Sequence, residues 1–98
     1  MERAYTIDEI KRISIPIAQR YGVKKLALFG SYAKGDQKSN SDIDFLIEKG
    51  RIQGLDFFGF INNLEDNFGV HVDVLTYDSL KESLLASAIE DEVVLYEG

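Results

Sequence analysis

The stretch from residue 26 to residue 44 constrains the fold of this chain more than any other part of its sequence. It opens with the apolar run Leu26–Phe29, typical of a strand buried on both faces, and the run stops at the turn-forming pair Gly30-Ser31. Asp42 and Asp44 follow, two positions apart, at the start of another β-favouring segment. Alternate side chains of a strand share a face, so we expect these two carboxylates to point the same way and to hold a divalent cation between them.

The pair Gly30-Ser31 has two compatible interpretations. A strand that turns sharply at a glycine can present backbone N–H groups to phosphate oxygens. Ser31 is also a residue type that commonly caps the start of a helix. Combined with the paired carboxylates, the turn predicts metal-assisted chemistry on a nucleoside triphosphate.

Hydrophobic periodicity and turn residues predict alternating helices and strands along the chain. Thr6 and Glu9 match a capping box before a helix that runs to Gly22, and Pro16 inside it predicts a kink or a break near Ser14. The other expected elements are a strand over Lys24–Phe29, one helical turn over Ser31–Lys34, a loop over Asp36–Ser41, a strand over Asp42–Glu48, a helix over Leu55–Phe68, a strand over Val70–Leu75, a last helix capped by Asp78 with Leu80, Leu84, Leu85 and Ile89, and a strand over Val93–Tyr96. This order favours an α/β (α+β) fold with a small mixed sheet of about four strands flanked by helices.

A third carboxylate, Asp73, lies inside an apolar strand between Val72 and Val74. If its strand neighbours the one that follows Asp42, the three acids form one cluster, and hard oxygen ligands of this kind suit Mg²⁺ or Mn²⁺. Two ions could then be held, one on the triphosphate and one on an acceptor hydroxyl. Asp73 is expected to be the ligand or base nearest the acceptor.

His71 shares the strand face of Asp73 and is the only histidine of the chain. It could be a metal ligand, but no second histidine or cysteine lies nearby in the sequence. A surface or supporting position beside the ligands is therefore the favoured interpretation.

Three phenylalanines at positions 57, 58 and 60 crowd the helix expected over Leu55–Phe68. One amphipathic face cannot accommodate all three, so at least one ring must leave the core-facing stripe. That ring could belong to a partner interface or pack beneath a loop.

Size and composition restrict the class of protein. With 98 residues, the chain is expected to form one domain over residues 1–98, without a separate substrate-binding lobe. A net charge of -6 argues against binding extended nucleic acid alone, since such binding depends on neutralising phosphates. The absence of cysteine excludes disulfides and thiolate chemistry. Without a membrane-length apolar run or a secretory signal, we expect a cytoplasmic protein, and a homo-oligomer stays open.

The pattern Gly-Ser, ten residues, Asp-x-Asp and a distant Asp in an apolar strand resembles the polymerase-beta-like nucleotidyltransferase superfamily, in particular its minimal nucleotidyltransferase (MNT) branch. By this resemblance, Gly30 and Ser31 bind the triphosphate, Asp42 and Asp44 bind metal, and Asp73 is the third catalytic acid. The family pattern continues Gly-Ser-x-Ala-Arg-Gly, and Lys34 stands here in place of the arginine. Lysine keeps the charge but lacks the planar fork of arginine, which implies a looser electrostatic contact with phosphate.

Proteins of this branch are often antitoxins that act on a small helical toxin of the HEPN type, and some transfer AMP from ATP to a tyrosine of that toxin. The resemblance therefore implies a metal-dependent nucleotidyltransferase with ATP as substrate and a HEPN-type partner. Two alternatives stay open at this point: a binding module that neutralises its partner by contact alone, and nucleotidyl transfer to a small molecule.

Overall fold

Helices and strands alternate along the chain in the computed structural model of the protein, which describes residues 4–35, 42–81 and 92–98. In chain order the elements are α1 (Ile7–Tyr21), β1 (Lys25–Phe29), α2 (Ser31–Lys34), β2 (Ile43–Glu48), α3 (Leu55–Phe68), β3 (Val72–Thr76), α4 (Tyr77–Lys81) and β4 (Val93–Glu97). This alternation is the one that the sequence predicts, with strand bounds that differ by one or two residues. The predicted loop at 36–41 and the predicted helix positions Leu84, Leu85 and Ile89 lie outside the described residues.

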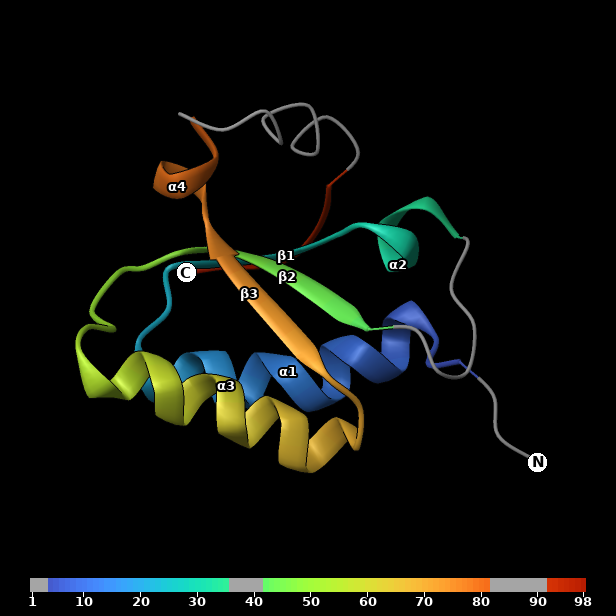
Figure 1. Cartoon of the computed structure of the whole chain (residues 1–98), viewed down its shortest axis with the longest axis horizontal. Helices are drawn as coiled ribbons and strands as arrows, with labels where there is room; N and C mark the ends of the chain where they lie inside the picture. The colour runs from blue at the N-terminus through green and yellow to red at the C-terminus, as the bar shows by residue number, and fades with distance from the viewer. Residues whose placement is uncertain (1–3, 36–41, 82–91) are drawn as a thin grey trace.

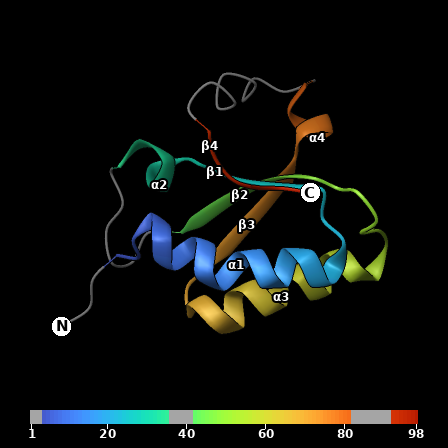
Figure 2. The same ribbon diagram turned by 180° about the vertical axis from the view of Figure 1, so that it is seen from behind.

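The four described strands form one mixed sheet in the order β3-β2-β1-β4. Strand β1 pairs antiparallel with both of its neighbours, whereas β2 and β3 are parallel. Helices α1 and α3 cover one face of the sheet and α4 lies on the other side, whereas α2 lies beyond the end of β1, with Tyr32 in the core on the α1 side (Figures 1 and 2). The predicted fold class, a small mixed sheet flanked by helices, is confirmed.

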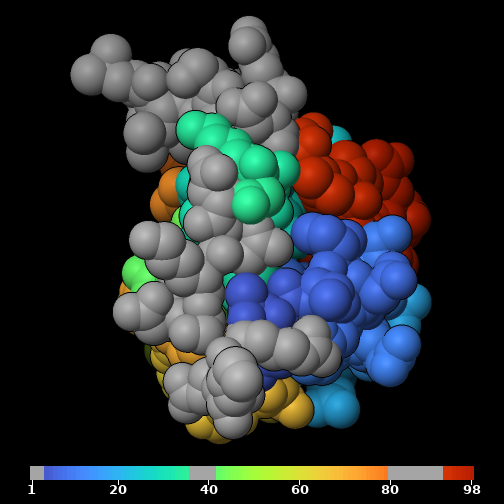
Figure 3. Space-filling model, turned by 90° about the vertical axis from the view of Figure 1, so that its right-hand side faces the viewer, coloured from blue at the N-terminus to red at the C-terminus, as the bar shows by residue number. Residues whose placement is uncertain are grey.

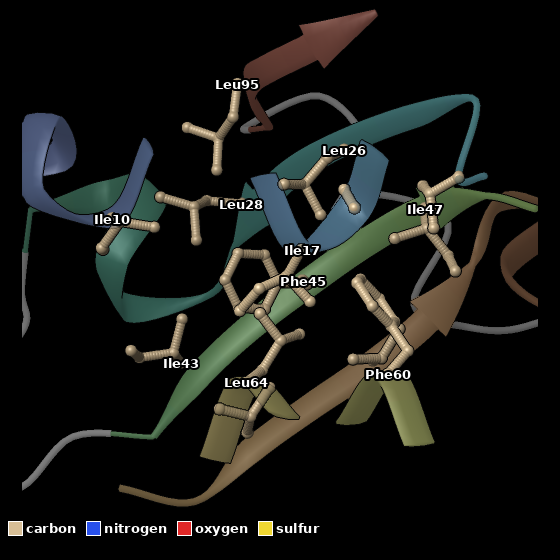
Figure 4. Close-up of a cluster of buried hydrophobic side chains, with 14 of the residues drawn as sticks. Ile10, Ile17, Leu26, Leu28, Ile43, Phe45, Ile47, Phe60, Leu64 and Leu95 are labelled. Carbon is tan, nitrogen blue, oxygen red and sulfur yellow. The ribbon is translucent and has the colours of Figure 1, made fainter. Parts of the chain in front are cut away.

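The main core lies between the sheet and the two long helices, where Figure 4 shows the side chains pointing toward one another. Leu26 and Phe45 from the sheet meet Ile10 of α1 and Phe60 and Leu64 of α3, and all five are fully buried. Burying one such side chain is worth about 1.5–3 kcal/mol of transfer free energy. A smaller apolar cluster on the opposite face of the sheet consists of Ala27, Phe29 and Leu46. Both central strands therefore bury residues on two faces.

Helix α1 begins at the predicted capping box and continues without interruption through its proline. The Thr6 hydroxyl oxygen accepts a hydrogen bond from the Glu9 amide at 3.1 Å, and the Glu9 carboxylate accepts one from the Thr6 amide at 2.9 Å. Of the two alternatives, a kink or a break near Ser14, the break is wrong, because α1 is one continuous helix with Pro16 on its exposed side. Solvent can there hydrogen-bond the carbonyl group that a proline leaves without its usual amide partner.

The start of α4 differs from the prediction. The helix begins at Tyr77, so Asp78 lies in its first turn and cannot be the cap. Thr76 takes this role, since its hydroxyl oxygen accepts a hydrogen bond from the Ser79 amide at 3.2 Å.

The first turns of α3 expose large apolar side chains. Leu55 is 84% exposed and Phe58 is 63% exposed, whereas Phe60 is fully buried. The expectation that one phenylalanine ring leaves the core is thus confirmed. No helix in the described ranges combines the length and the hydrophobicity needed to cross a lipid bilayer.

Candidate active site

The three predicted carboxylates meet at one end of the sheet. Asp44 on β2 is the register partner of Asp73 on β3, and Asp73 lies close enough to raise the pKa of the Asp44 carboxyl group. Asp42 lies one residue before β2, and its carboxylate lies within 4.8 Å of a carboxylate oxygen of Asp73. The expectation that the second and third strands are neighbours is confirmed.

The turn after β1 lies directly against the half-buried Asp44. Gly30 has φ 71° and ψ -147°, a backbone conformation that residues with a Cβ atom avoid. A Cβ atom added to Gly30 would lie 2.4 Å from Asp44 Oδ2. Glycine is therefore required here both by the backbone and by the close approach of the carboxylate.

The residues after Gly30 form the short helix α2, which Figure 3 shows above the start of α1 in a view onto this end of the molecule. Gly30 itself is the N-cap, and Ser31 is the first helical residue, so the interpretation of Ser31 as N-cap is wrong. Tyr32 is a packing residue: it is buried, and its hydroxyl oxygen accepts a hydrogen bond from the Tyr5 amide at 3.3 Å. Lys34 lies exposed in the last turn.

The carboxyl group of Asp44 carries an unfavourable charge in the metal-free protein. Its pKa is raised from an ordinary value of 3.8 to about 6, mainly by burial and then by the neighbouring charges of Asp73 and Asp42, while His71 acts in the opposite direction. A cation at this position would relieve the repulsion and restore the carboxylate.

His71 lies between two carboxylates. Its Nε2 atom is 3.0 Å from Asp73 Oδ1, and its Nδ1 atom is 3.1 Å from Oε2 of Glu65, near the end of α3. The hydrogen bond with Asp73 is the main reason that the pKa of His71 lies above its ordinary value. The sequence predicts His71 on the strand face of Asp73, as found, but it does not predict the contact with Glu65.

The donor groups fit a divalent cation of the Mg²⁺ or Mn²⁺ class. Asp42, His71 and Asp73 each offer one ligand atom, and these atoms lie within 4.8 Å of one another. An ion about 2.1 Å from each ligand can span this spacing with small side-chain adjustments. Carboxylate oxygens suit Mg²⁺ and Mn²⁺, and a cation beside Asp44 would offset the charges of Asp73 and Asp42 that raise the pKa of its carboxyl group.

The stability of the metal-free protein should fall as pH rises from about 4 to about 6. In this interval the folded state retains a proton on Asp44, whose folded pKa is about 6, while the unfolded chain releases it near 3.8. Deprotonation therefore favours the unfolded chain. Urea unfolding in the presence of a chelator, at pH 4.5 and 6.5, measures the change. The difference in stability between the unmodified protein and Asp44→Asn should depend on pH, and a constant difference would contradict the assignment.

The chain resembles known proteins in both sequence and fold. The family model described as nucleotidyltransferase domain matches residues 10–96. A protein of Methanocaldococcus jannaschii, provisionally named as a protein adenylyltransferase, is 46% identical over 89 residues, covering 86% of this chain and 96% of the relative. Protein adenylyltransferase MntA of Thermococcus cleftensis is 31% identical over 93 residues, covering 90% of this chain and 94% of the relative.

Two solved structures share the fold. One described as a minimal nucleotidyltransferase superposes with a TM-score of 0.72 at 24% identity, covering 91% of this chain and 95% of the other. The second is a complex of a tri-AMPylated HEPN toxin of Shewanella oneidensis with its MNT antitoxin. It superposes with a TM-score of 0.65 at 14% identity, covering 95% of this chain and 74% of the matched chain. At these identities the likeness shows a common fold.

Proposed function

Because the chain belongs to the nucleotidyltransferase domain family and is an enzyme of that family, we propose that it transfers AMP from ATP to a hydroxyl group of a partner protein. In this proposal Asp42, Asp44 and Asp73 bind the metal ions. The observation that carries it is the pairing of Asp44 with Asp73 across parallel strands, directly beside the turn at Gly30. The adenylyltransferase names of the relatives support the same reaction class.

The turn at Gly30 would receive the triphosphate of ATP. Backbone N–H groups at Gly30 and Ser31 would donate to phosphate oxygens, and the exposed Lys34 would add positive charge close by. When bound, two ions of the Mg²⁺ or Mn²⁺ class would neutralise the phosphates and lower the pKa of the acceptor hydroxyl. Asp44 anchors this arrangement because it touches both the turn and the third acid.

Asp73 is the acid best placed to face an external acceptor. Its side chain is 52% exposed on β3, which lies at the edge of the described sheet, whereas Asp44 is half-buried. In the transfer step the acceptor oxygen forms a bond to the α-phosphorus, and the bond from that phosphorus to the bridging oxygen of pyrophosphate breaks. Pyrophosphate leaves with the electron pair, and Asp73 takes the acceptor proton.

The acceptor we propose is a tyrosine of a HEPN-type toxin, with this chain as the antitoxin. The solved complex of a tri-AMPylated HEPN toxin with an MNT antitoxin supports this choice, since a chain of the same fold is there bound to a toxin that carries AMP. The chain spans 96% of its Methanocaldococcus relative, so the same short architecture is shared.

Mass spectrometry of the partner tests the proposal. The protein is incubated with ATP, Mg²⁺ and the candidate toxin, and the toxin should gain one or more AMP units. The gain should disappear with Asp42→Ala, and peptide mapping should locate it on tyrosine. Toxin inhibition without any mass change, unaffected by Asp42→Ala, would instead establish neutralisation by contact alone.

A further inference from the structure

His71 is fixed from both sides by acids on two different elements. Glu65 Oε2, near the end of α3, lies 3.1 Å from His71 Nδ1 and also accepts a hydrogen bond of 3.1 Å from the Val72 amide. On the other side, His71 Nε2 lies 3.0 Å from Asp73 Oδ1. The ring is thereby held in one orientation although 58% of the side chain is exposed.

The Glu65 contact determines which nitrogen faces the candidate active site. An ionised carboxylate only accepts hydrogen bonds, so Nδ1 must be the donor toward Glu65. In a neutral imidazole, Nε2 then carries the lone pair, and this atom lies on the side of Asp42 and Asp73. A lone pair next to a carboxylate oxygen is unfavourable, so either a second ring proton or a metal ion must lie between Nε2 and Asp73, and the ion would take the place of that proton.

This arrangement matches the way proteins hold metal-ligating histidines. Such a histidine usually donates its second ring N–H to a carboxylate or carbonyl group, which fixes the tautomer and the ring plane. Here Glu65 is that carboxylate, and it is itself fixed by the Val72 amide. The ligand atoms of Asp42, His71 and Asp73 all lie within 4.8 Å of one another.

We propose that His71 is a direct ligand, through Nε2, of one of the divalent ions in the transfer site, together with Asp42 and Asp73, and that Glu65 is the positioning residue that orients it. The proposal rests on the proposed function, since it concerns the same metal site. Imidazole suits transition metals and not Mg²⁺, and Mn²⁺ is a first-row transition metal that also accepts carboxylate oxygens. The site should therefore favour Mn²⁺ over Mg²⁺ more strongly than three carboxylates alone would.

Pulsed electron paramagnetic resonance of bound Mn²⁺ tests direct ligation without any measurement of catalysis. Because the chain contains one histidine, protein prepared without a histidine tag gives an unambiguous signal. Echo-envelope modulation should show coupling to an imidazole ¹⁴N nucleus, and His71→Asn should abolish it. Bound Mn²⁺ without this coupling in the unmodified protein would overturn the proposal.

The role of Glu65 is tested by Glu65→Gln, with Asp66→Asn as its control. Each substitution removes one negative charge from α3. Glu65→Gln should weaken Mn²⁺ binding by about 10- to 100-fold, the usual effect of losing the partner of a ligating histidine. Asp66→Asn, at the next and exposed position of α3, should leave the Kd for Mn²⁺ within about twofold, since its charge acts only through screened solvent. If Glu65 serves only to hold the Val72 amide, Glu65→Gln would lower Tm and leave the Mn²⁺ Kd unchanged, which would contradict its positioning role.

Metal preference tests whether His71 is a ligand, and transfer activity tests the proposed function, so the two proposals can fail independently. In His71→Asn, the ratio of the Mg²⁺ Kd to the Mn²⁺ Kd should fall by at least about fivefold, because the ligand that distinguishes the two metals is lost. A ratio that does not change would overturn the ligand assignment even if AMP transfer is observed. Conversely, ¹⁴N coupling in a protein that transfers AMP to no partner would support His71 as ligand and contradict the proposed function.

Discussion

Asp44→Asn is expected to lower the rate of AMP transfer by about 10³-fold and, at the same time, to stabilise the metal-free protein. The rate should fall because metal ligation contributes several kcal/mol of transition-state stabilisation and each 1.36 kcal/mol corresponds to a factor of ten. Stability should rise because Asp44 is half-buried beside Asp73 and Asp42, and its pKa of about 6 shows that the folded protein disfavours its charge at neutral pH.

Both effects can be measured on the same preparations. Transfer is followed as AMP incorporation into the partner with Mg²⁺ present, and Tm is measured in a chelator and again with millimolar Mg²⁺ or Mn²⁺. The metal should raise the Tm of the unmodified protein by mass action, by an amount that corresponds to about 2.7 kcal/mol at a hundredfold excess over Kd. In Asp44→Asn this increase should be smaller, since only the ion held by Asp42, His71 and Asp73 keeps its proposed protein ligands.

Asp56→Asn is the matched control for Asp44→Asn. Asp56 lies exposed in the first turn of α3, at the end of that helix away from Glu65. The substitution removes one negative charge outside the candidate active site, so it should neither slow transfer nor raise Tm. Transfer by Asp44→Asn within tenfold of the unmodified rate would contradict the proposed metal site.

Gly30→Ala should reduce AMP transfer by about 10²-fold, the loss expected when a reacting group is displaced by about 1 Å. The added Cβ atom would lie 2.4 Å from Asp44 Oδ2, so the turn or the carboxylate must move. Alanine is also strained at φ 71°, which costs about 1–2 kcal/mol of stability.

Gly54→Ala separates the contact from the backbone strain. Gly54 occupies the N-cap of α3 with φ 62° and ψ -135°, close to the φ 71° and ψ -147° of Gly30 at the N-cap of α2. No atom lies within 4 Å of the position that its Cβ would take. The two variants should therefore lose similar stability, measured by urea unfolding, but Gly54→Ala should keep its transfer rate. Equal transfer rates in both variants would show that the approach of Asp44 to the turn does not matter for the reaction.

The sequence predicted the parts of the site that depend on local periodicity. Asp42 and Asp44 share a face because a strand alternates its side chains, and Asp73 joins them because its strand pairs in register with theirs. The contact between Glu65 and His71 could not be predicted in this way. It depends on how the last turn of α3 packs beside the start of β3, and sequence periodicity does not determine that packing.

Two further differences have simple physical origins. Pro16 leaves α1 continuous because it faces solvent. The isoleucines on both sides of Pro16 gave no sign of this exposure in the sequence. The cap of α4 falls on Thr76 because β3 extends one residue further than the apolar pattern predicts. Neither difference moves a residue of the candidate active site.

The parallel pairing of β2 with β3 has a consequence for the order in which the protein acquires its activity. Parallel neighbours need a long crossover, here through α3, so Asp73 reaches Asp44 only after that helix has docked on the sheet. During synthesis on the ribosome, a nascent chain that ends before β3 holds the Gly30 turn and two of the acids but lacks the third. We therefore expect such truncated fragments to be inert, and the appearance of high-affinity Mn²⁺ binding to report the completion of folding.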